Sequence, residues 1–149
     1  MIRTARTDDV PAIQACAELA YEKYTARIGQ APAPMIADFA AQVRLRQTRV
    51  IEGENARLLG FIVFYPRGEH MHLENVAILP ECAGQGLGRR LISYCEETAR
   101  ALGLNSIELY TNARMTENLR LYPTLGYVET DRRLEDGFDR VFFRKLLTD

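Results

Sequence analysis

The spacing of apolar side chains divides the first part of the chain into one strand and two helices. Residues 2–6 alternate apolar and polar side chains, as a half-buried strand does. Residues 10–24 repeat apolar side chains every three or four positions, which predicts a helix with one buried stripe. Thr7 precedes this helix and offers a hydroxyl to cap it. A break at residues 28–34, rich in glycine and proline, separates it from a second helix predicted over residues 35–46.

Three further strands are predicted over residues 49–52, 57–65 and 70–79. The turns between them are short, which favours antiparallel neighbours. The middle segment is apolar at almost every position, so we expect a central strand that is buried on both faces. We expect the chain to turn after it at residues 66–68, because proline and glycine occur there.

The second half of the chain alternates helices and strands. A helical stripe of apolar residues starts at Leu87 and ends before Gly103, a natural C-terminal stop for a helix. After it we predict, in order, a strand over residues 106–111, a short helix over residues 116–125, and two strands over residues 127–133 and 140–146 around the hairpin-turn sequence Glu135-Asp136-Gly137.

The predicted element order is β-α-α-β-β-β-α-β-α-β-β, which indicates a single mixed α/β (α+β) domain over residues 1–149. We expect a mixed, mostly antiparallel sheet of about six to seven strands, flanked by about four helices. An apolar content of 47% and a charged content of 26% fit a globular chain with one core.

Composition and charge argue against several classes of function. The chain has 19 basic and 20 acidic residues and no basic half, which disfavours nucleic acid as a partner because phosphate binding needs concentrated positive charge. No apolar run reaches the ~18 residues of a membrane span. The first residues lack the apolar stretch of a secretion signal, so we expect a cytoplasmic protein without a membrane partner. Three cysteines without Cys-x-x-Cys spacing disfavour a zinc ribbon or a disulfide framework.

The strongest chemical signal is a glycine-rich turn between a predicted strand and a predicted helix. Gly84, Gly86 and Gly88 alternate with other residues, so the backbone can curl closely around a ligand. Backbone amides and the helix N-terminus favour an anion there, two arginines follow directly, and a pyrophosphate is the natural ligand. A P-loop is excluded because no Gly-Lys-Ser/Thr sequence occurs. A dinucleotide fingerprint is excluded because the spacing is Gly-x-Gly-x-Gly and four strands precede it.

Two sequence motifs resemble those of a known family. The sequence Asn75-Val76-Ala77-Ile78-Leu79-Pro80 is followed by Gly84-Gln85-Gly86-Leu87-Gly88-Arg89-Arg90-Leu91. Further on, Asn118-Leu119-Arg120-Leu121-Tyr122 is followed by Leu125-Gly126-Tyr127. The first motif closely resembles the acetyl-CoA motif of the GNAT superfamily of N-acetyltransferases, and the second resembles the other signature of that family. The predicted element order also fits, so the resemblance spans nearly the whole chain.

The resemblance implies acetyl-CoA as the co-substrate and assigns roles to residues of both motifs. Backbone groups of Val76, Ala77 and Ile78 would pair with the pantetheine arm, as an added strand does. Asn118 would contact the cofactor from the side. Dimerisation is common in the family, which leaves a homodimer open. The pyrophosphate would be held by the backbone amides of Gly84, Gln85, Gly86, Leu87, Gly88 and Arg89.

The sequence departs from the family pattern at two positions. Ala83 stands where glutamine or arginine is usual, so one side-chain contact to the cofactor is missing. The resemblance places Tyr122 near the sulfur as the general acid for the leaving thiolate, and Pro123 follows it directly. Because proline removes a helix hydrogen bond and disfavours α geometry in the preceding residue, we expect a kink there that affects the aim of Tyr122.

Two side chains are alternatives for the base that deprotonates the attacking amine, and a reaction without a dedicated base is the third alternative. His70, His72 and Glu74 occupy alternate positions of the predicted strand, so we expect them on one face together with Val76 and Ile78. His72 has a suitable intrinsic pKa, whereas Glu74 would act through a water molecule if its pKa is raised. The same three side chains could instead bind a divalent metal, but a metal-binding protein has no use for the glycine turn. We therefore expect no metal.

The expected reaction is direct attack of a primary amine on the thioester. The acceptor would be a small metabolite, an antibiotic, a peptide N-terminus or a lysine, and no residue identifies it. We expect its pocket between residues 21–39 and the hairpin at residues 133–140. A non-catalytic acyl-CoA-binding or regulatory domain is the alternative function. The side chains proposed to shape the pocket are Tyr21, Tyr24, Phe39, Arg132, Arg133 and Asp136.

Overall fold

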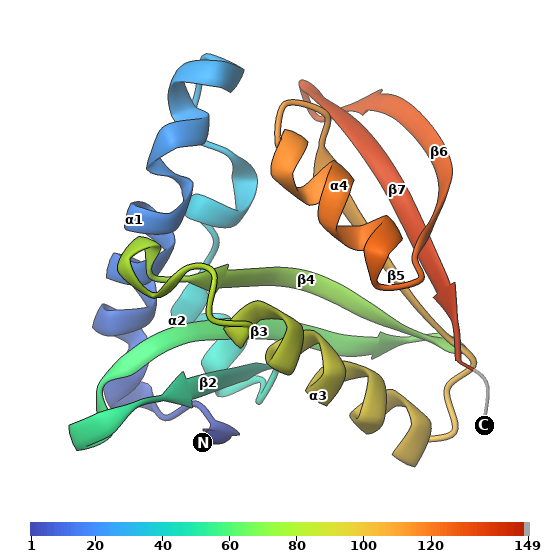
Figure 1. The fold of residues 1–149 in the computed structure, drawn as a ribbon. Helices are drawn as coiled ribbons and strands as arrows, with labels where there is room; N and C mark the ends of the chain where they lie inside the picture. Colours follow the sequence, from blue (N-terminus) through green and yellow to red (C-terminus); the bar gives the residue numbers. More distant parts are fainter. Residues whose placement is uncertain (148–149) are drawn as a thin grey trace.

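The computed structural model describes residues 1–147 and contains one mixed sheet with helices on both faces (Figure 1). The spatial order is β1-β2-β3-β4-β5-β7-β6, and β4 and β5 are the one parallel pair within these residues. The predicted fold class and element order are confirmed, while the predicted domain end at residue 149 lies outside the described residues. The strands are β1 (Ile2–Thr4), β2 (Thr48–Glu52), β3 (Leu58–Arg67), β4 (His70–Ile78), β5 (Ser106–Asn112), β6 (Val128–Glu135) and β7 (Phe138–Leu146).

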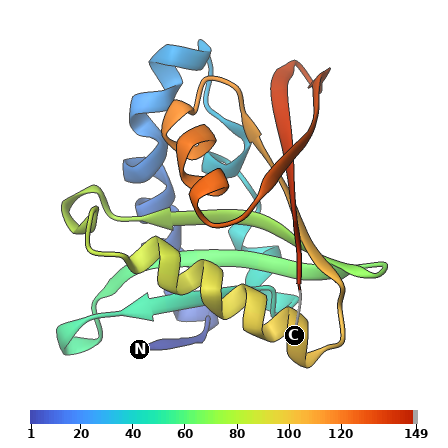
Figure 2. The same ribbon diagram turned by 45° about the vertical axis from the view of Figure 1, so that its right-hand side comes forward.

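The helices cover the sheet from opposite sides (Figures 1 and 2). The first two lie behind the strands in Figure 1 and the last two lie in front of them. Of the helices within residues 1–147, none combines the length and the apolar character that a bilayer-spanning segment requires. The helices are α1 (Val10–Ile28), α2 (Phe39–Arg44), α3 (Leu87–Ala101) and α4 (Thr116–Thr124).

Strand β3 forms the centre of the core. Phe61–Val63 are fully buried, because adjacent positions of a strand face opposite sides and helices cover both of them. The Phe61 ring meets the ring of Phe39 in α2 at a centroid distance of 5.7 Å, whereas Phe64 lies 6.3 Å from Tyr94 of α3. The prediction of a strand buried on both faces is confirmed. The strand runs longer than predicted, and the chain turns at Gly68, where φ is 64°.

The two N-terminal helices begin differently from the prediction. Thr7 does not cap α1, because it lies in a preceding 3-10 turn, and Asp9 accepts a backbone N–H there instead. The helix predicted over residues 35–46 is shorter. A separate 3-10 turn at Ala33–Met35 comes first, and Asp38 then caps α2 by accepting the N–H of its third residue.

Strands β4 and β5 diverge and open the sheet. They pair only where His70–His72 lies beside Ser106–Glu108. Beyond these residues β4 continues with β3 while β5 continues with β7, so the two parts of the sheet separate like the arms of a V (Figure 2). The facing edges of both strands therefore have backbone groups without a neighbouring strand, and the candidate site lies at this opening.

Candidate active site

The glycine-rich turn before α3 presents a row of free backbone amides. Gly84 and Gly86 have positive φ angles of 81° and 78°, and a Cβ at either position would meet no atom within 4 Å. The amide of Ala83 donates to the preceding turn and the amide of Arg90 donates to Gly86. Between them, the amides of residues 84–89 donate to no group within residues 1–147.

These free amides lie at the N-terminus of α3, where the helix dipole favours negative charge. A run of free N–H donors with open space at Gly84 and Gly86 fits a diphosphate group such as that of coenzyme A. Arg89 is exposed beside the turn and adds positive charge. The geometry therefore suits the predicted contacts of Gly84, Gln85, Gly86, Leu87, Gly88 and Arg89.

The open edge of β4 offers only alternate residues to a ligand. The Val76 carbonyl accepts the hydroxyl of Tyr21 at 2.9 Å, so it points away from β3. The Ala77 carbonyl lies against Gly60 of β3, where an added Cβ would come within 2.6 Å of it. Because backbone groups alternate along a strand, Val76 and Ile78 face the opening, whereas Ala77 pairs with β3. The predicted backbone contact is therefore corrected for Ala77 and stays a prediction for Val76 and Ile78.

A bulge at Glu74 changes which face each residue of β4 occupies. Two adjacent residues of β3 pair with Leu73 and Asn75, which leaves Glu74 without a partner in β3. An extra residue reverses the alternation of side chains along the strand. Val76 and Ile78 therefore lie on the α3 face of the sheet, and the two histidines of β4 lie on the opposite face. The expectation that the histidines and Glu74 share one face with Val76 and Ile78 was wrong.

Glu74 and His72 form a hydrogen-bonded pair at the cleft. His72 Nε2 lies 2.5 Å from Glu74 Oε2, and His72 is buried between the rings of Tyr65 and Tyr110 at centroid distances of 5.3 and 5.9 Å. The hydrogen bond from His72 lowers the pKa of Glu74, although burial acts in the opposite direction. Glu74 is therefore a carboxylate at neutral pH. The raised pKa that we required for action through a water molecule is not observed.

His70 is not part of this pair. Its Nδ1 lies 3.3 Å from the carboxylate of Glu108 in β5. In the part of the chain that the structure describes, no three His, Cys, Asp or Glu side chains are grouped to hold a metal ion. The metal-binding alternative for His70, His72 and Glu74 therefore has no converging donor set.

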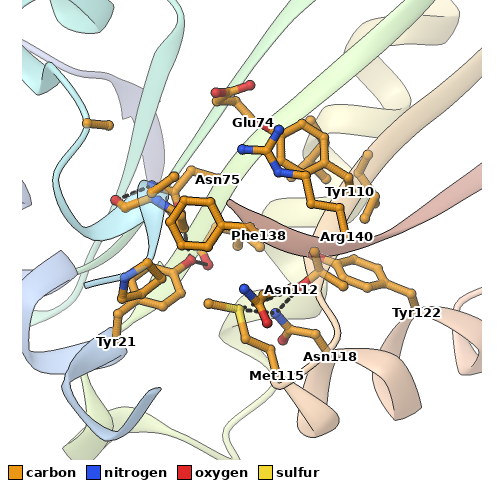
Figure 3. Close-up of a pocket in the computed structure, with 18 residues that line it drawn as sticks. Tyr21, Glu74, Asn75, Tyr110, Asn112, Met115, Asn118, Tyr122, Phe138 and Arg140 are labelled. Carbon is orange, nitrogen blue, oxygen red and sulfur yellow. Dashed lines mark hydrogen bonds between the residues drawn. The ribbon is translucent and has the colours of Figure 1, made fainter. Parts of the chain in front are cut away.

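Tyr122 lies on α4, and its side chain forms part of the cleft wall (Figure 3). It is 4% exposed, and its ring packs 5.5 Å from Tyr127 and 5.7 Å from Phe143. Its hydroxyl has no hydrogen-bond partner within residues 1–147, and burial raises the pKa of the phenol. Pro123 does not end the helix, which continues to Thr124, so Tyr122 keeps its place in the wall.

The cleft lies where β4 and β5 diverge (Figure 3). Asn118 of α4 lines it and donates through Nδ2 to the hydroxyl of Thr111 at 3.1 Å. The two regions expected around the acceptor both contribute lining residues, which are Tyr21, Pro32, Ala33, Pro34, Ala37, Phe138 and Arg140.

Most side chains that were proposed individually to shape the acceptor pocket lie elsewhere. Tyr24 and Phe39 are buried in the hydrophobic core. Arg132 pairs with Glu129 on the exposed strand β6. Arg133 pairs with carboxylates of the same hairpin, and Asp136 reaches the cleft only through its contact with Arg140. Of these proposals, Tyr21 lines the cleft directly.

Arg140 was missed by the sequence analysis. It is 7% exposed and lines the cleft, with its guanidinium carbon 4.3 Å from the centre of the Tyr110 ring. Alternation along the predicted strand at residues 140–146 puts Arg140 on the same face as Phe142. This pattern could have indicated that Arg140 faces the interior. The contact with Tyr110 joins residues that are far apart in the chain, so no local pattern could indicate it.

The sequence of this chain is similar to those of known acetyltransferases. The model of the acetyltransferase (GNAT) family matches residues 13–127. The catalytic subunit NAA20 of the N-terminal acetyltransferase B complex of Arabidopsis thaliana is 29% identical over 101 residues, covering 60% of this chain and 58% of that protein. The aminoalkylphosphonate N-acetyltransferase of Salmonella typhimurium is 29% identical over 86 residues, covering 53% of this chain and 55% of that protein. The chain thus spans little more than half the length of these curated relatives.

The fold is also found among solved structures. The PaiA N-acetyltransferase of Thermoplasma acidophilum, solved in complex with coenzyme A, aligns with a TM-score of 0.80 at 16% identity. The alignment covers 98% of each chain. With the family model matching most of its length, this chain belongs to the acetyltransferase (GNAT) family.

Proposed function

We propose that this chain is an acetyl-CoA-dependent N-acetyltransferase that moves an acetyl group from the thioester to a primary amine by direct attack. The observation that carries the proposal is the row of amides at residues 84–89, which have no partner in the described part of the chain and lie next to the open edge of β4. Acetyl-CoA is the co-substrate of the family, and it supplies the activated acetyl group when bound. The acceptor is an amine on a small molecule or a peptide.

The chain's own backbone would hold the co-substrate. The amides of residues 84–89 would bind its diphosphate, while Val76 and Ile78 would pair with its amide-bearing arm at the edge that β5 leaves open. An N–H of the same edge is available to stabilise the oxyanion that forms during attack. Asn118 would contact the arm from the side of α4. These contacts would direct the thioester into the cleft.

Glu74 is the group proposed to meet the attacking amine. Its carboxylate lines the cleft and is ionised, so it attracts an ammonium group and accepts a proton from it, directly or through a water molecule. A low pKa makes Glu74 a weak base on its own. His72 is buried behind Glu74 and acts through their hydrogen bond, so we assign it a positioning role.

Tyr122 is the proposed general acid. The amine nitrogen forms a bond to the carbonyl carbon, the carbon–sulfur bond breaks, and the departing thiolate takes the proton of the Tyr122 hydroxyl. Burial raises the pKa of this phenol, which keeps it protonated at neutral pH. The same apolar surroundings raise the proton affinity of a thiolate, so the transfer stays feasible inside the cleft.

One experiment separates the enzyme from a non-catalytic acyl-CoA-binding domain. Isothermal titration calorimetry measures the binding of acetyl-CoA, and a thiol reagent measures release of CoA after a panel of primary amines is added. We expect binding and amine-dependent thiol release. Binding without release for every amine would leave the non-catalytic function, and absence of binding would refute both. The cytoplasmic location and the homodimer expected from the sequence stay predictions.

A further inference from the structure

Arg140 carries an unused hydrogen-bonding edge in the cleft. Its Nη1 donates to Glu135 at 2.7 Å and to Asp136 at 3.3 Å. Its Nε and Nη2 have no hydrogen-bond partner within residues 1–147, and both atoms keep accessible surface. The side chain is 8% exposed and stacks on Tyr110, so it is fixed from two sides. The free edge, with its parallel N–H donors, is the part that remains for a ligand in the cleft (Figure 3).

The charges around Arg140 determine which acceptor group fits this edge. Two carboxylates, those of Glu135 and Asp136, already contact one guanidinium group. A ligand carboxylate would bring a third negative charge into the same cluster, and like charges in contact oppose binding. A neutral carbonyl oxygen can accept hydrogen bonds from both free donors without adding charge. The site therefore favours a neutral carbonyl group over an anion.

Glu74 supplies the complementary contact for an ammonium group. It lines the same cleft as a carboxylate. Its partner His72 lies 5.9 Å from the Tyr110 ring on which Arg140 stacks, so Glu74 and Arg140 belong to one cluster of side chains. An amine with a carbonyl group on the neighbouring carbon carries the two groups that these side chains would bind, an ammonium group for Glu74 and a carbonyl oxygen for Arg140.

We propose, on the basis of the proposed function, that the acceptor is an α-amine whose neighbouring carbon carries a neutral carbonyl group, the unit at a peptide N-terminus. Arg140 selects this unit by donating its free edge to the carbonyl oxygen. The catalytic subunit NAA20, one of the relatives, is named as part of an N-terminal acetyltransferase, which agrees with this chemistry. A short aminoacyl amide and a peptide share the unit, and the experiment distinguishes them.

The test compares acceptors that differ at the carbonyl group. L-alanine amide, a trialanine amide, free L-alanine and propan-2-amine are each assayed by thiol release with the wild-type protein and with Arg140→Gln. Because the four amines differ in intrinsic reactivity, the decisive quantity is the wild-type to variant ratio of kcat/KM for each amine. We expect a ratio of roughly 10 to 100 for the two amides, since a lost hydrogen bond to a charged group has that effect. We expect less than about threefold for propan-2-amine.

Arg132→Gln is the matched control. Arg132 lies in the same hairpin, is exposed and pairs only with Glu129 among the described residues, so its loss should leave all four rates unchanged. Thermal unfolding and acetyl-CoA binding show whether each variant is folded. Arg140→Lys keeps the charge but lacks the planar pair of donors, so it should lose the amide preference as well, and it replaces Arg140→Gln if that variant unfolds.

The possible outcomes separate this proposal from the proposed function. Equal ratios for the amides and propan-2-amine would overturn the role of Arg140 while leaving an active N-acetyltransferase. Free alanine that reacts as well as its amide, with the same dependence on Arg140, would overturn the preference for a neutral group. Faster reaction of trialanine amide supports a peptide acceptor, and reaction of alanine amide alone supports a small aminoacyl amide. Absence of thiol release with every amine would instead refute the proposed function.

Discussion

Replacing Gly86 by aspartate tests the amide cradle, with Gly103→Asp as a matched control. Both glycines have positive φ, 78° and 74°, and both have open space where a Cβ would stand. They flank α3, whose 15 residues at 1.5 Å each separate the two positions by about 22 Å. Each substitution imposes the same left-handed backbone on a side chain, at roughly 1 kcal/mol, but only Gly86→Asp puts a carboxylate beside the proposed diphosphate site.

The expected loss of affinity follows from the repulsion between like charges. Two unit charges about 6 Å apart repel by about 3 kcal/mol at an effective dielectric constant of about 20. This energy corresponds to a loss of acetyl-CoA affinity of roughly 100-fold for Gly86→Asp. Calorimetry measures both dissociation constants. Thermal unfolding should show the smaller loss of stability for Gly86→Asp, because the dipole of α3 favours a carboxylate at the N-terminus of the helix and disfavours one at its C-terminus. A dissociation constant for Gly86→Asp that equals that of Gly103→Asp would refute the cradle.

Three further variants test other parts of the site and the fold. Tyr122→Phe should lower kcat about 10- to 100-fold without changing acetyl-CoA affinity in calorimetry, and an unchanged kcat would exclude the acid role. Gly60→Ala should destabilise the protein by about 1–3 kcal/mol in urea unfolding, because the Cβ would meet the Ala77 carbonyl at 2.6 Å. Hydrogen bonds from Arg3 lower the pKa of Asp9, which stabilises the fold above the unfolded pKa. Asp9→Asn should therefore lose about 1–3 kcal/mol at pH 7, and the difference should shrink as pH falls below about 4 in acid titrations; an equal difference at pH 3 would contradict this.

The sequence predicted those features that depend on local spacing. Element order follows from apolar periodicity, and the glycine turn before α3 is a short motif with a direct physical meaning. The faces of β4 were predicted incorrectly because the bulge at Glu74 depends on pairing with β3, and no pattern within β4 indicates it. The backbone contact of Ala77 was also predicted incorrectly, because its carbonyl lies against the neighbouring strand β3.

The side chains of the acceptor cleft were the hardest to predict. Arg140 meets Tyr110 and Glu135 only after β5, β6 and β7 have paired, so its burial is a property of the tertiary structure. Tyr24 and Phe39 were assigned to the pocket because they are aromatic residues of the predicted region, but both are buried in the hydrophobic core. Burial and partner residues have to be known before such a side chain can be assigned.

The short parallel contact between β4 and β5 has a consequence for the behaviour of the protein in the cell. A molecule inserted in the gap would act as the absent strand and tie the two arms together. At a ligand concentration 100 times the dissociation constant, binding would then add about 2.7 kcal/mol to the free energy of unfolding. The resistance of this protein to proteolysis should consequently rise and fall with the metabolic supply of its thioester.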